Sequence, residues 1–371
     1  MRKIPLIKPF VNNSVFPAVK KVLDSGMLTD GLVTREFERK VCDYVGIQYG
    51  MANPNCALAL ELSLKALKIK KDDEIIIPDY THPATINAVI SAGGKPVLVD
   101  VDMDTYNISL SAADEAVSEK TKAIMPVSLF GQPVNIEKLI SMKKEHDFSI
   151  VEDAACSLGA EYKGFRAGKL SDITCFSFHP RKILSTGEGG MLVTKSKEIF
   201  DIAKQMKMFG GRLIPGTKIF EYYELGGNYK FPNILAAMGI EQLALLDNVI
   251  DDRIKKAHKY IDLLKETEGI ECPKEIPDTK HTFQSFCCLL SKDIDRNKLI
   301  LNLKRDGIES QIGSYCLSIQ PVFKNIKRGG ELINSKDIFN RALVLPLYHS
   351  MTENDQMYVV EKLKKEIKSL I

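Results

Sequence analysis

The sequence predicts an α/β fold in which helices cover a mostly parallel sheet, and three observations carry this prediction. From about residue 47 to residue 195, short β-rich runs alternate with amphipathic stretches, which is typical of parallel strands joined by helices. Seven of these runs are predicted as strands. The chain has 371 residues, of which 44% are hydrophobic, so it can bury a large core and is expected to hold two domains.

The expected strands are spaced so that a helix fits between most of them. They are Tyr49 to Asn53, Glu74 to Pro78, Pro96 to Asp100, Lys122 to Val127, Phe148 to Asp153, Ile173 to Phe178 and Gly190 to Thr194. A helix is predicted over Ala57 to Leu67, because its leucines recur at helical spacing. Another is predicted over His82 to Ala92, where a proline at the second position is typical of a helix start.

The second half of the chain changes character. Apolar residues recur every three or four positions from Ile234 to about Glu268, and we expect one long connecting helix there. A smaller αβ set follows, with these elements: a strand over Phe283 to Leu290, a helix near Asp295 to Asp306, and a last helix from Thr352, which can form a capping pair with Asp355. The predicted domains are therefore residues 1–248, with an N-terminal arm, and residues 249–371.

Two long irregular stretches interrupt this pattern, at Phe209 to Gly227 and at Gln311 to Ser335. Loops of this length in a compact domain are usually functional.

Composition excludes several classes of function. Lys and Arg number 51 against 48 Asp and Glu, a balance that argues against nucleic acid or an anionic membrane as the main partner. No run of about 18 apolar residues occurs, and the first ten residues lack a secretory signal, so we expect a cytoplasmic protein. The eight cysteines form no CxxC pair, and we expect reduced thiols with no disulfide framework and no metal site.

One acid and one lysine carry the main chemical signal. Asp153 ends a predicted strand, and Lys182 lies 29 residues later, just past another. Both side chains are expected at the carboxyl edge of the sheet, where open α/β folds bind ligands. A lysine amine can form a Schiff base with an aldehyde, and a carboxylate can keep a pyridine nitrogen protonated, which together meet the needs of pyridoxal phosphate (PLP). The alternatives are a helix-capping aspartate and a solvated surface lysine.

The wider pattern resembles the DegT/DnrJ/EryC1/StrS family of PLP-dependent sugar aminotransferases, almost from end to end. The segments that carry the resemblance are DGLVTREFE (Asp30 to Glu38), DDEIIIPDYTHPATINAV (Asp72 to Val89), GGKPVLVDVDMDTYNI (Gly93 to Ile108), KAIMPVSLFGQPVNI (Lys122 to Ile136), VEDAACSLGA (Val151 to Ala160), SFHPRKILSTGEGG (Ser177 to Gly190), GGNYKFPNILAAMGIEQL (Gly226 to Leu243) and ALVLPLYHSMT (Ala342 to Thr352). The resemblance implies the aspartate aminotransferase-like fold type I, with a seven-stranded, mostly parallel sheet in a large domain and a smaller C-terminal α/β domain.

The resemblance also implies roles for residues around the cofactor. Lys182 would hold PLP covalently and shuttle a proton, Asp153 would pair with the pyridine nitrogen, and Ser177 would bind the phosphate. The phosphate cradle departs from the family pattern, since Asn55-Cys56-Ala57 stands where relatives read Ser/Asn-Gly-Thr. The backbone amides of Cys56 and Ala57 can still bind an anion at a helix N-terminus.

Two further departures surround the cofactor ring. His82 replaces an aromatic residue and is expected to stack on the ring, the alternative being a capping or buried neutral histidine. Cys156 replaces a Gln or Glu near the phenolic oxygen, where Ser157 could take over the contact.

Lys230, with Asn228 beside it, matches the position from which a neighbouring subunit of the family reaches the phosphate. The resemblance therefore implies a homodimer with composite active sites.

By the same resemblance the substrates are glutamate and a nucleotide-linked keto sugar, which react by a ping-pong mechanism. Ser318 stands where relatives carry a histidine, which indicates an altered sugar pocket. The other candidate substrate contacts are Tyr315, Arg181, Arg212 and Glu188, each with a plain surface role as its alternative.

Two other functions stay open: a PLP-dependent sugar 3-dehydratase, although such relatives have histidine in place of Lys182, and a PLP-binding regulator without turnover.

Overall fold

An eight-stranded sheet forms the centre of the large domain in the computed structural model, which describes residues 2–370. Its strand order is β1-β10-β9-β6-β5-β2-β4-β18, and β1, β10 and β9 pair antiparallel while the remaining pairs are parallel. The strands are β1 (Tyr49–Asn53), β2 (Glu74–Pro78), β4 (Lys95–Val99), β5 (Thr121–Ile124), β6 (Ser149–Asp153), β9 (Ile173–Ser177), β10 (Gly190–Thr194) and β18 (Lys327–Arg328). All seven expected strands are present, and the short β18 is an eighth that the sequence pattern does not reveal.

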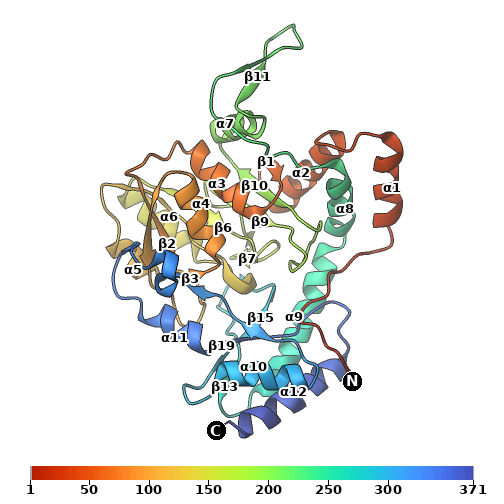
Figure 1. The fold of residues 1–371 in the computed structure, drawn as a ribbon, viewed down its shortest axis with the longest axis vertical. Coiled ribbons are helices and arrows are strands. Elements are labelled where there is room, and N and C mark those ends of the chain that lie inside the picture. Colours follow the sequence, from red (N-terminus) through yellow and green to blue (C-terminus); the bar gives the residue numbers. More distant parts are fainter. Residues whose placement is uncertain (1, 371) are drawn as a thin grey trace.

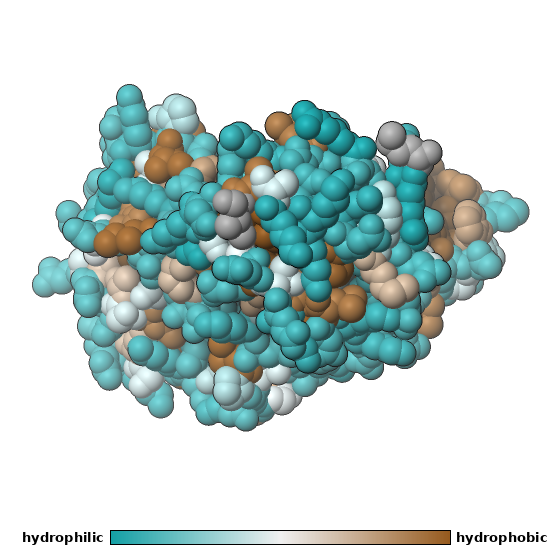
Figure 2. Space-filling view, turned by 90° about the horizontal axis from the view of Figure 1, so that it is seen from below, coloured by the Kyte–Doolittle hydropathy of each residue, from teal (hydrophilic) through white to brown (hydrophobic). Residues whose placement is uncertain are grey.

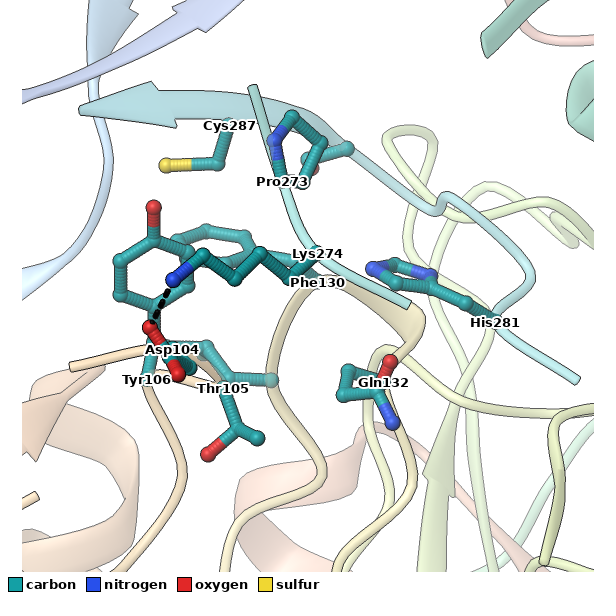
Figure 3. A pocket seen from close by; sticks show the side chains of 11 residues that line it. Asp104, Thr105, Tyr106, Phe130, Gln132, Pro273, Lys274, His281 and Cys287 are labelled. Carbon is teal, nitrogen blue, oxygen red and sulfur yellow. Dashed lines mark hydrogen bonds and ion pairs between the residues drawn. The ribbon is translucent and has the colours of Figure 1, made fainter. Parts of the chain in front are cut away.

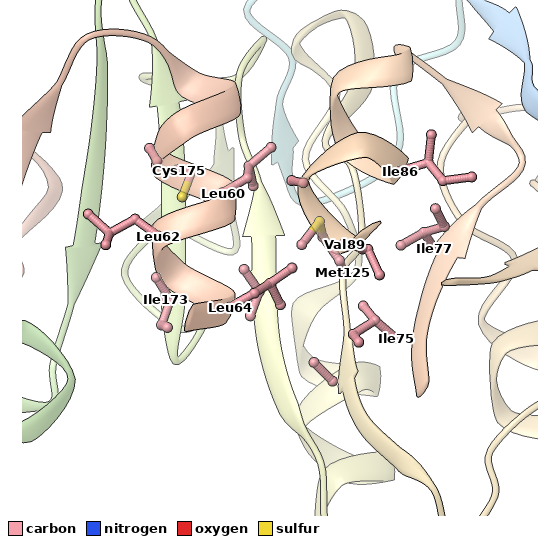
Figure 4. Packing of buried hydrophobic residues seen from close by; sticks show 14 of the residues in the cluster. Leu60, Leu62, Leu64, Ile75, Ile77, Ile86, Val89, Met125, Ile173 and Cys175 are labelled. Atoms are coloured by element: carbon pink, nitrogen blue, oxygen red, sulfur yellow. The ribbon is translucent and has the colours of Figure 1, made fainter. Parts of the chain in front are cut away.

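Helices cover both faces of this sheet because successive strand residues point to opposite sides. On one face, Ile75 and Ile77 pack with Leu60 and Leu64 under the helices α3 and α4 (Figure 4). On the other face, Ile76 belongs to a separate apolar cluster beneath α5 and α6. The helices of the large domain are α1 (Val15–Ser25), α2 (Leu32–Val45), α3 (Cys56–Ala66), α4 (Pro83–Ser91), α5 (Leu110–Glu115), α6 (Ile136–Glu145), α7 (Lys197–Lys207) and α8 (Asn233–Leu243).

A smaller sheet, with strand order β13-β15-β19-β16, lies at the other end of the molecule (Figure 1). Its strands are β13 (Ile270–Glu271), β15 (Phe286–Leu290), β16 (Gln311–Ile312) and β19 (Ala342–Leu345), and the helices of this half are α9 (Leu246–Leu264), α10 (Arg296–Arg305), α11 (Ile333–Arg341) and α12 (Glu353–Lys368). The expected capping box between Thr352 and Asp355 is present at the start of α12. The expected strand from Phe283 begins only at Phe286, since Phe283 has a φ of 46°.

The expectation of one long helix from Ile234 to Glu268 is wrong. Two helices, α8 and α9, occupy this region and meet at an angle of 59°. The bend has a packing cause: Ala236 of α8 contributes to the core beside α2, whereas Tyr260 of α9 contributes to the core under the small sheet. No proline or glycine marks the join at 244–245, so the apolar period runs through it without a visible break.

The predicted boundary between residues 248 and 249 falls inside α9, and it stays a prediction. The C-terminal half also returns to the large domain at two places. There β17 (Tyr315–Cys316) pairs with β3 (Tyr80–Thr81), and β18 pairs with β4.

The two long irregular stretches contain short elements. One holds a hairpin of β11 (Gly211–Leu213) and β12 (Phe220–Tyr222), which projects from the large domain (Figure 1). The other holds β16, β17 and β18 with the short 3₁₀ helices η2 (Leu317–Ile319) and η3 (Pro321–Phe323). A third 3₁₀ turn, η1 (Leu129–Gly131), follows β5. A small separate sheet consists of β7 (Glu161–Tyr162), β8 (Phe165–Arg166) and β14 (Thr279–Lys280).

The surface on the small-sheet side is mainly hydrophilic, with small separate apolar patches (Figure 2). Within residues 2–370, no single helix has the length and apolarity to cross a membrane; only the bent pair α8 and α9, taken together, meets that measure of length and composition.

Candidate functional site

Asp153 and Lys182 come together because β6 and β9 are neighbouring parallel strands. Asp153 is the last residue of β6 and pairs in register with Cys175 of β9. Lys182 follows β9 in a turn that is closed by its backbone amide, which donates to the carbonyl of His179 at 2.8 Å. Both side chains therefore lie at the same edge of the sheet, and each affects the pKa of the other.

The carboxylate of Asp153 is buried, with 4% of the residue exposed. It accepts a hydrogen bond from the Thr85 hydroxyl at 2.9 Å and another from the backbone amide of Ala155 at 3.2 Å. Burial raises the pKa of Asp153, while these two donors and Lys182 act in the opposite direction. A buried carboxylate held by neutral donors is suited to receive a cationic ring nitrogen.

The amine of Lys182 donates a hydrogen bond to the sulfur of Cys156 at 3.1 Å. Burial lowers the pKa of Lys182, but the neighbouring Cys156, Cys56 and Asp153 outweigh it and leave the pKa raised. The amine is thus half-enclosed next to an acid and a thiol.

Gln284, from the C-terminal half, fixes the backbone on both sides of Lys182. Its side-chain oxygen accepts from the amide of Ile183 at 2.9 Å, and its side-chain nitrogen donates to the carbonyl of Arg181 at 2.5 Å. The buried Arg253 of α9 in turn donates to the Gln284 carbonyl at 2.7 Å. Neither Thr85 nor Gln284 was expected from the sequence, because each acts through a contact between segments far apart in the chain.

The predicted phosphate cradle is a helix N-terminus. The Asn55 side chain caps α3 by accepting from the amide of Leu58 at 2.9 Å. Among the described residues, no hydrogen bond uses the amides of Cys56 and Ala57, so both can donate to an anion. The loop packs tightly against β10, since a Cβ at Gly190 would lie 2.5 Å from the nitrogen of Cys56.

Two serines belong to the same neighbourhood. Ser177 ends β9, and its hydroxyl accepts from the amide of His179 at 3.4 Å. The hydroxyl of Ser157 is buried and has no hydrogen-bond partner within the part of the chain that the structure describes. A buried hydroxyl without a partner is normally satisfied by a ligand or by water. Together with the free amides of the cradle, the Lys182 amine and the Asp153 carboxylate, it fits the polar groups of PLP.

His82 caps α4 with its ring nitrogen Nδ1, which accepts from the amide of Ala84 at 3.1 Å. Burial, with Lys182 next in effect, lowers the pKa of His82, which keeps the ring neutral. The ring of Tyr315 lies edge-on to it, with the centroids 6.1 Å apart. The capping alternative is therefore present, and stacking on the cofactor stays a prediction.

The remaining predicted residues lie in different settings. Lys230 places its ammonium 4.8 Å from the centre of the Phe209 ring, and its backbone amide donates to the Asn228 side chain at 3.4 Å. Arg181 donates to Gln311 at 3.2 Å, and Glu188 is exposed. Arg212 donates to Gln205 at 2.6 Å.

Ser318 is buried, and its hydrogen-bonding groups are engaged by Asp79. The Ser318 amide and hydroxyl donate to that carboxylate at 2.6 and 2.9 Å. The hydroxyl of Ser335 donates to it at 2.7 Å. Ser318 therefore joins the C-terminal segment to the end of β2, and its part in a sugar pocket stays a prediction.

A separate small pocket lies between loops of the large domain and the segment that leads into β15 (Figure 3). Lys274 forms an ion pair with Asp104 at 2.5 Å beside it. Burial lowers the pKa of its His281 to about 3, so this histidine is neutral. None of the predicted cofactor residues lines this pocket.

Comparisons with known proteins bear on the whole chain. The profile described as the DegT/DnrJ/EryC1/StrS aminotransferase family matches residues 10–364. GDP-perosamine synthase of Escherichia coli O157:H7 is 30% identical, over 98% of this chain and 99% of its own length. A pleiotropic regulatory protein of Geobacillus stearothermophilus is 32% identical over 94% of each chain. The structure of Spr1654 from Streptococcus pneumoniae in its PLP form has the same fold, with a TM-score of 0.94 at 24% identity over the full length of both chains.

Proposed function

The chain belongs to the DegT/DnrJ/EryC1/StrS aminotransferase family, and from this premise we propose that it is a PLP-dependent enzyme that transfers an amino group from glutamate to a nucleotide-linked keto sugar. The observation that carries the proposal is the meeting of the Lys182 amine and the buried Asp153 carboxylate at one edge of the sheet. GDP-perosamine synthase, similar over nearly its whole length, supports a sugar as the acceptor.

When bound, PLP supplies an electron sink for negative charge that develops on the substrate carbon. Lys182 holds the cofactor through Nζ and later carries a proton to and from that carbon. Asp153, oriented by the Thr85 hydroxyl, keeps the ring nitrogen protonated. The amides of Cys56 and Ala57 and the Ser177 hydroxyl bind the phosphate, and Gln284 holds the backbone that presents Lys182.

The reaction proceeds in two halves in this proposal. Glutamate gives up its amino group in the first half and leaves as 2-oxoglutarate. The keto sugar receives the amino group in the second half, and Lys182 returns the proton to the sugar carbon. In each half, the same amine would therefore act first as a base and then as an acid.

The proposal includes a homodimer in which Lys230 reaches the phosphate of the neighbouring subunit. Lys230 and Asn228 follow the projecting hairpin, and Lys230 contacts only an exposed ring, Phe209, among the interactions of its ammonium that the structure describes. Mixing inactive Lys182→Ala chains with Lys230→Ala chains should restore part of the activity if the sites are composite. No restoration would indicate self-contained protomers.

A second candidate function has one observation in its favour. The similar Geobacillus stearothermophilus protein is named a pleiotropic regulatory protein, and the cradle Asn55-Cys56-Ala57 departs from the family pattern. A regulator of this kind would bind PLP without turnover. The 3-dehydratase alternative is weakened by Lys182, since such relatives carry histidine there.

A spectrum distinguishes these functions. The purified protein with PLP should show the visible absorbance of a lysine-bound cofactor, and glutamate should bleach it as 2-oxoglutarate forms. Binding without bleaching would favour the regulator and contradict the aminotransferase. A panel of nucleotide-linked keto sugars, with glutamate as donor, would then identify the acceptor.

A further inference from the structure

Cys156 and Lys182 are in direct contact, and the proposed reaction assigns no role to this contact. The Lys182 amine lies 3.1 Å from the Cys156 sulfur. Cys156 lies in the turn after β6, which is closed by the Ser157 amide donating to the Ala154 carbonyl at 3.0 Å. Since β6 and β9 are hydrogen-bonded neighbours, the sheet itself holds the two turns together.

The thiol of Cys156 is also the accessible one in its neighbourhood. Cys56 and Cys175 are buried, whereas Cys156 is only partly buried. A small oxidant can therefore reach the partly buried Cys156 beside the Lys182 amine. Two groups held at contact distance react far faster than the same groups free in solution.

We propose that Cys156 and Lys182 form a reversible sulfur–nitrogen cross-link when a hydroperoxide oxidises the thiol. In the first step the peroxide O–O bond breaks and sulfur gains a hydroxyl, which gives a sulfenic acid and one water from hydrogen peroxide. In the second step the Lys182 nitrogen attacks the sulfur and the S–O bond breaks. The departing hydroxide takes the amine proton and leaves as a second water.

The cross-link is a two-electron oxidation of the pair, and thiol reductants reverse it. One thiol attacks the sulfur and releases the amine, and a second thiol then frees Cys156 from the mixed disulfide. The consequence rests on the proposed function: a cross-linked Lys182 has no amine with which to hold PLP. Cofactor already attached to Lys182 should in turn protect the pair.

A pair of cysteines, Cys272 and Cys288, provides an internal comparison. Cys272 directly follows β13, which pairs with β15, and its contact with Cys288 of that strand lowers the pKa of Cys272. Cys272 is also partly buried, so it competes for the same oxidant. Its oxidation products contain no Lys182 and are separated by peptide mapping.

To test this, the cofactor-free protein is treated with hydrogen peroxide, its remaining thiols are blocked, and its peptides are identified by mass spectrometry. We expect the Cys156 and Lys182 peptides joined and lighter by two hydrogen atoms, a product that dithiothreitol removes. Uptake of PLP, followed by absorbance, should fall in proportion to the joined fraction and recover with dithiothreitol. Protein loaded with PLP before the peroxide should give no joined peptide.

Three variants make the test specific. Cys272→Ser should still form the joined peptide, and Cys156→Ser should not. Lys182→Ala should accumulate a sulfenic acid at Cys156 that dimedone labels. Peroxide-treated wild type in which Cys156 stays a free thiol, or is recovered only as sulfinic acid, would overturn the proposal. The mass readout requires no turnover. If no joined peptide forms, the aminotransferase proposal still stands. If no transamination is found, the cross-link proposal still stands.

Discussion

The two ends of the predicted cofactor site are built from different kinds of groups. At the ring end, side chains do the chemistry, and other side chains hold them: Thr85 holds Asp153, and Cys156 contacts Lys182. At the phosphate end, two of the proposed donors are the backbone amides of Cys56 and Ala57 at the start of α3, beside the side chains of Ser177 and Lys230. A substitution of Asp153 or Lys182 removes the functional atom itself, whereas one at Cys56 or Ala57 leaves the backbone donor in place.

This difference explains where the sequence departs from its family. The phosphate cradle departs at two of its three positions, Cys56 and Ala57, while Asp153 and Lys182 keep the family residues. His82 and Cys156 show that the ring end varies too, but at positions around the two charged groups. The contrast predicts a graded series of effects.

Lys182→Ala should have the largest effect. It removes both the attachment point and the proton carrier, and transamination should fall by about 10³-fold or more. The assay is 2-oxoglutarate formation from glutamate, with circular dichroism to show that the variant folds. Lys122→Ala, at an exposed lysine of β5, is the control and should stay near wild type. Activity near wild type in Lys182→Ala would remove this residue from its role.

Asp153→Asn should lower the rate by about 10²- to 10³-fold, because the charge opposite the ring nitrogen is lost. It should also stabilise the cofactor-free protein at neutral pH. Burial raises the pKa of Asp153, so the folded state binds its proton more tightly than the unfolded chain. Stability therefore falls as pH rises from the ordinary aspartate pKa through the raised one, and the deficit persists above it.

Urea unfolding of the cofactor-free protein measures this second effect. Asp153→Asn should be more stable than wild type at about pH 7, and the gain should shrink towards about pH 4. If Asp153→Asn is less stable than wild type at both pH values, burial of the Asp153 charge does not destabilise the folded protein.

Thr85→Val should have an intermediate effect. It removes the hydroxyl that donates to Asp153 at 2.9 Å while keeping the shape of the side chain. Loss of a hydrogen bond to a charged group costs about 1.5 kcal/mol or more, so the cofactor dissociation constant should rise by about tenfold or more. Thr85→Ser keeps the hydroxyl and should stay close to wild type in a titration with PLP. Equal losses in both variants would point to packing instead of the hydrogen bond.

Changes at the phosphate end should have the smallest effects. Cys56→Ala leaves the amide donor and should alter the PLP dissociation constant by about twofold or less. Ala57→Thr restores the hydroxyl that relatives carry and should tighten binding by about threefold to tenfold. A large loss in Cys56→Ala would show that the Cys56 side chain itself contributes to cofactor binding.

The sequence predicts the large sheet well because each strand carries its own local signal. Three of the expected strands, Tyr49–Asn53, Glu74–Pro78 and Gly190–Thr194, have the observed bounds. The meeting of Asp153 and Lys182 also follows from sequence, since both come at the carboxyl ends of expected parallel strands.

The rest depends on contacts that no local pattern records. Thr85 reaches Asp153 across 68 residues, and Gln284 reaches Ile183 across 101. The bend between α8 and α9 reflects a change of packing partner, and β18 is too short to show a period. The sequence does not reveal that Ser318 contacts a carboxylate 239 residues earlier, while the altered sugar pocket that it indicates stays a prediction.

That carboxylate constrains how the protein is made. Asp79 is fully buried, and the donors to its carboxylate come from Cys316, Ser318 and Ser335, which the ribosome adds long after it. Enclosing a carboxyl group without hydrogen-bond donors is costly, so the end of β2 gains its full set of partners only after residue 335 has been added. We therefore expect this carboxylate to be enclosed late in synthesis, and a chain that stops before residue 316 to lack the donors that the full chain supplies.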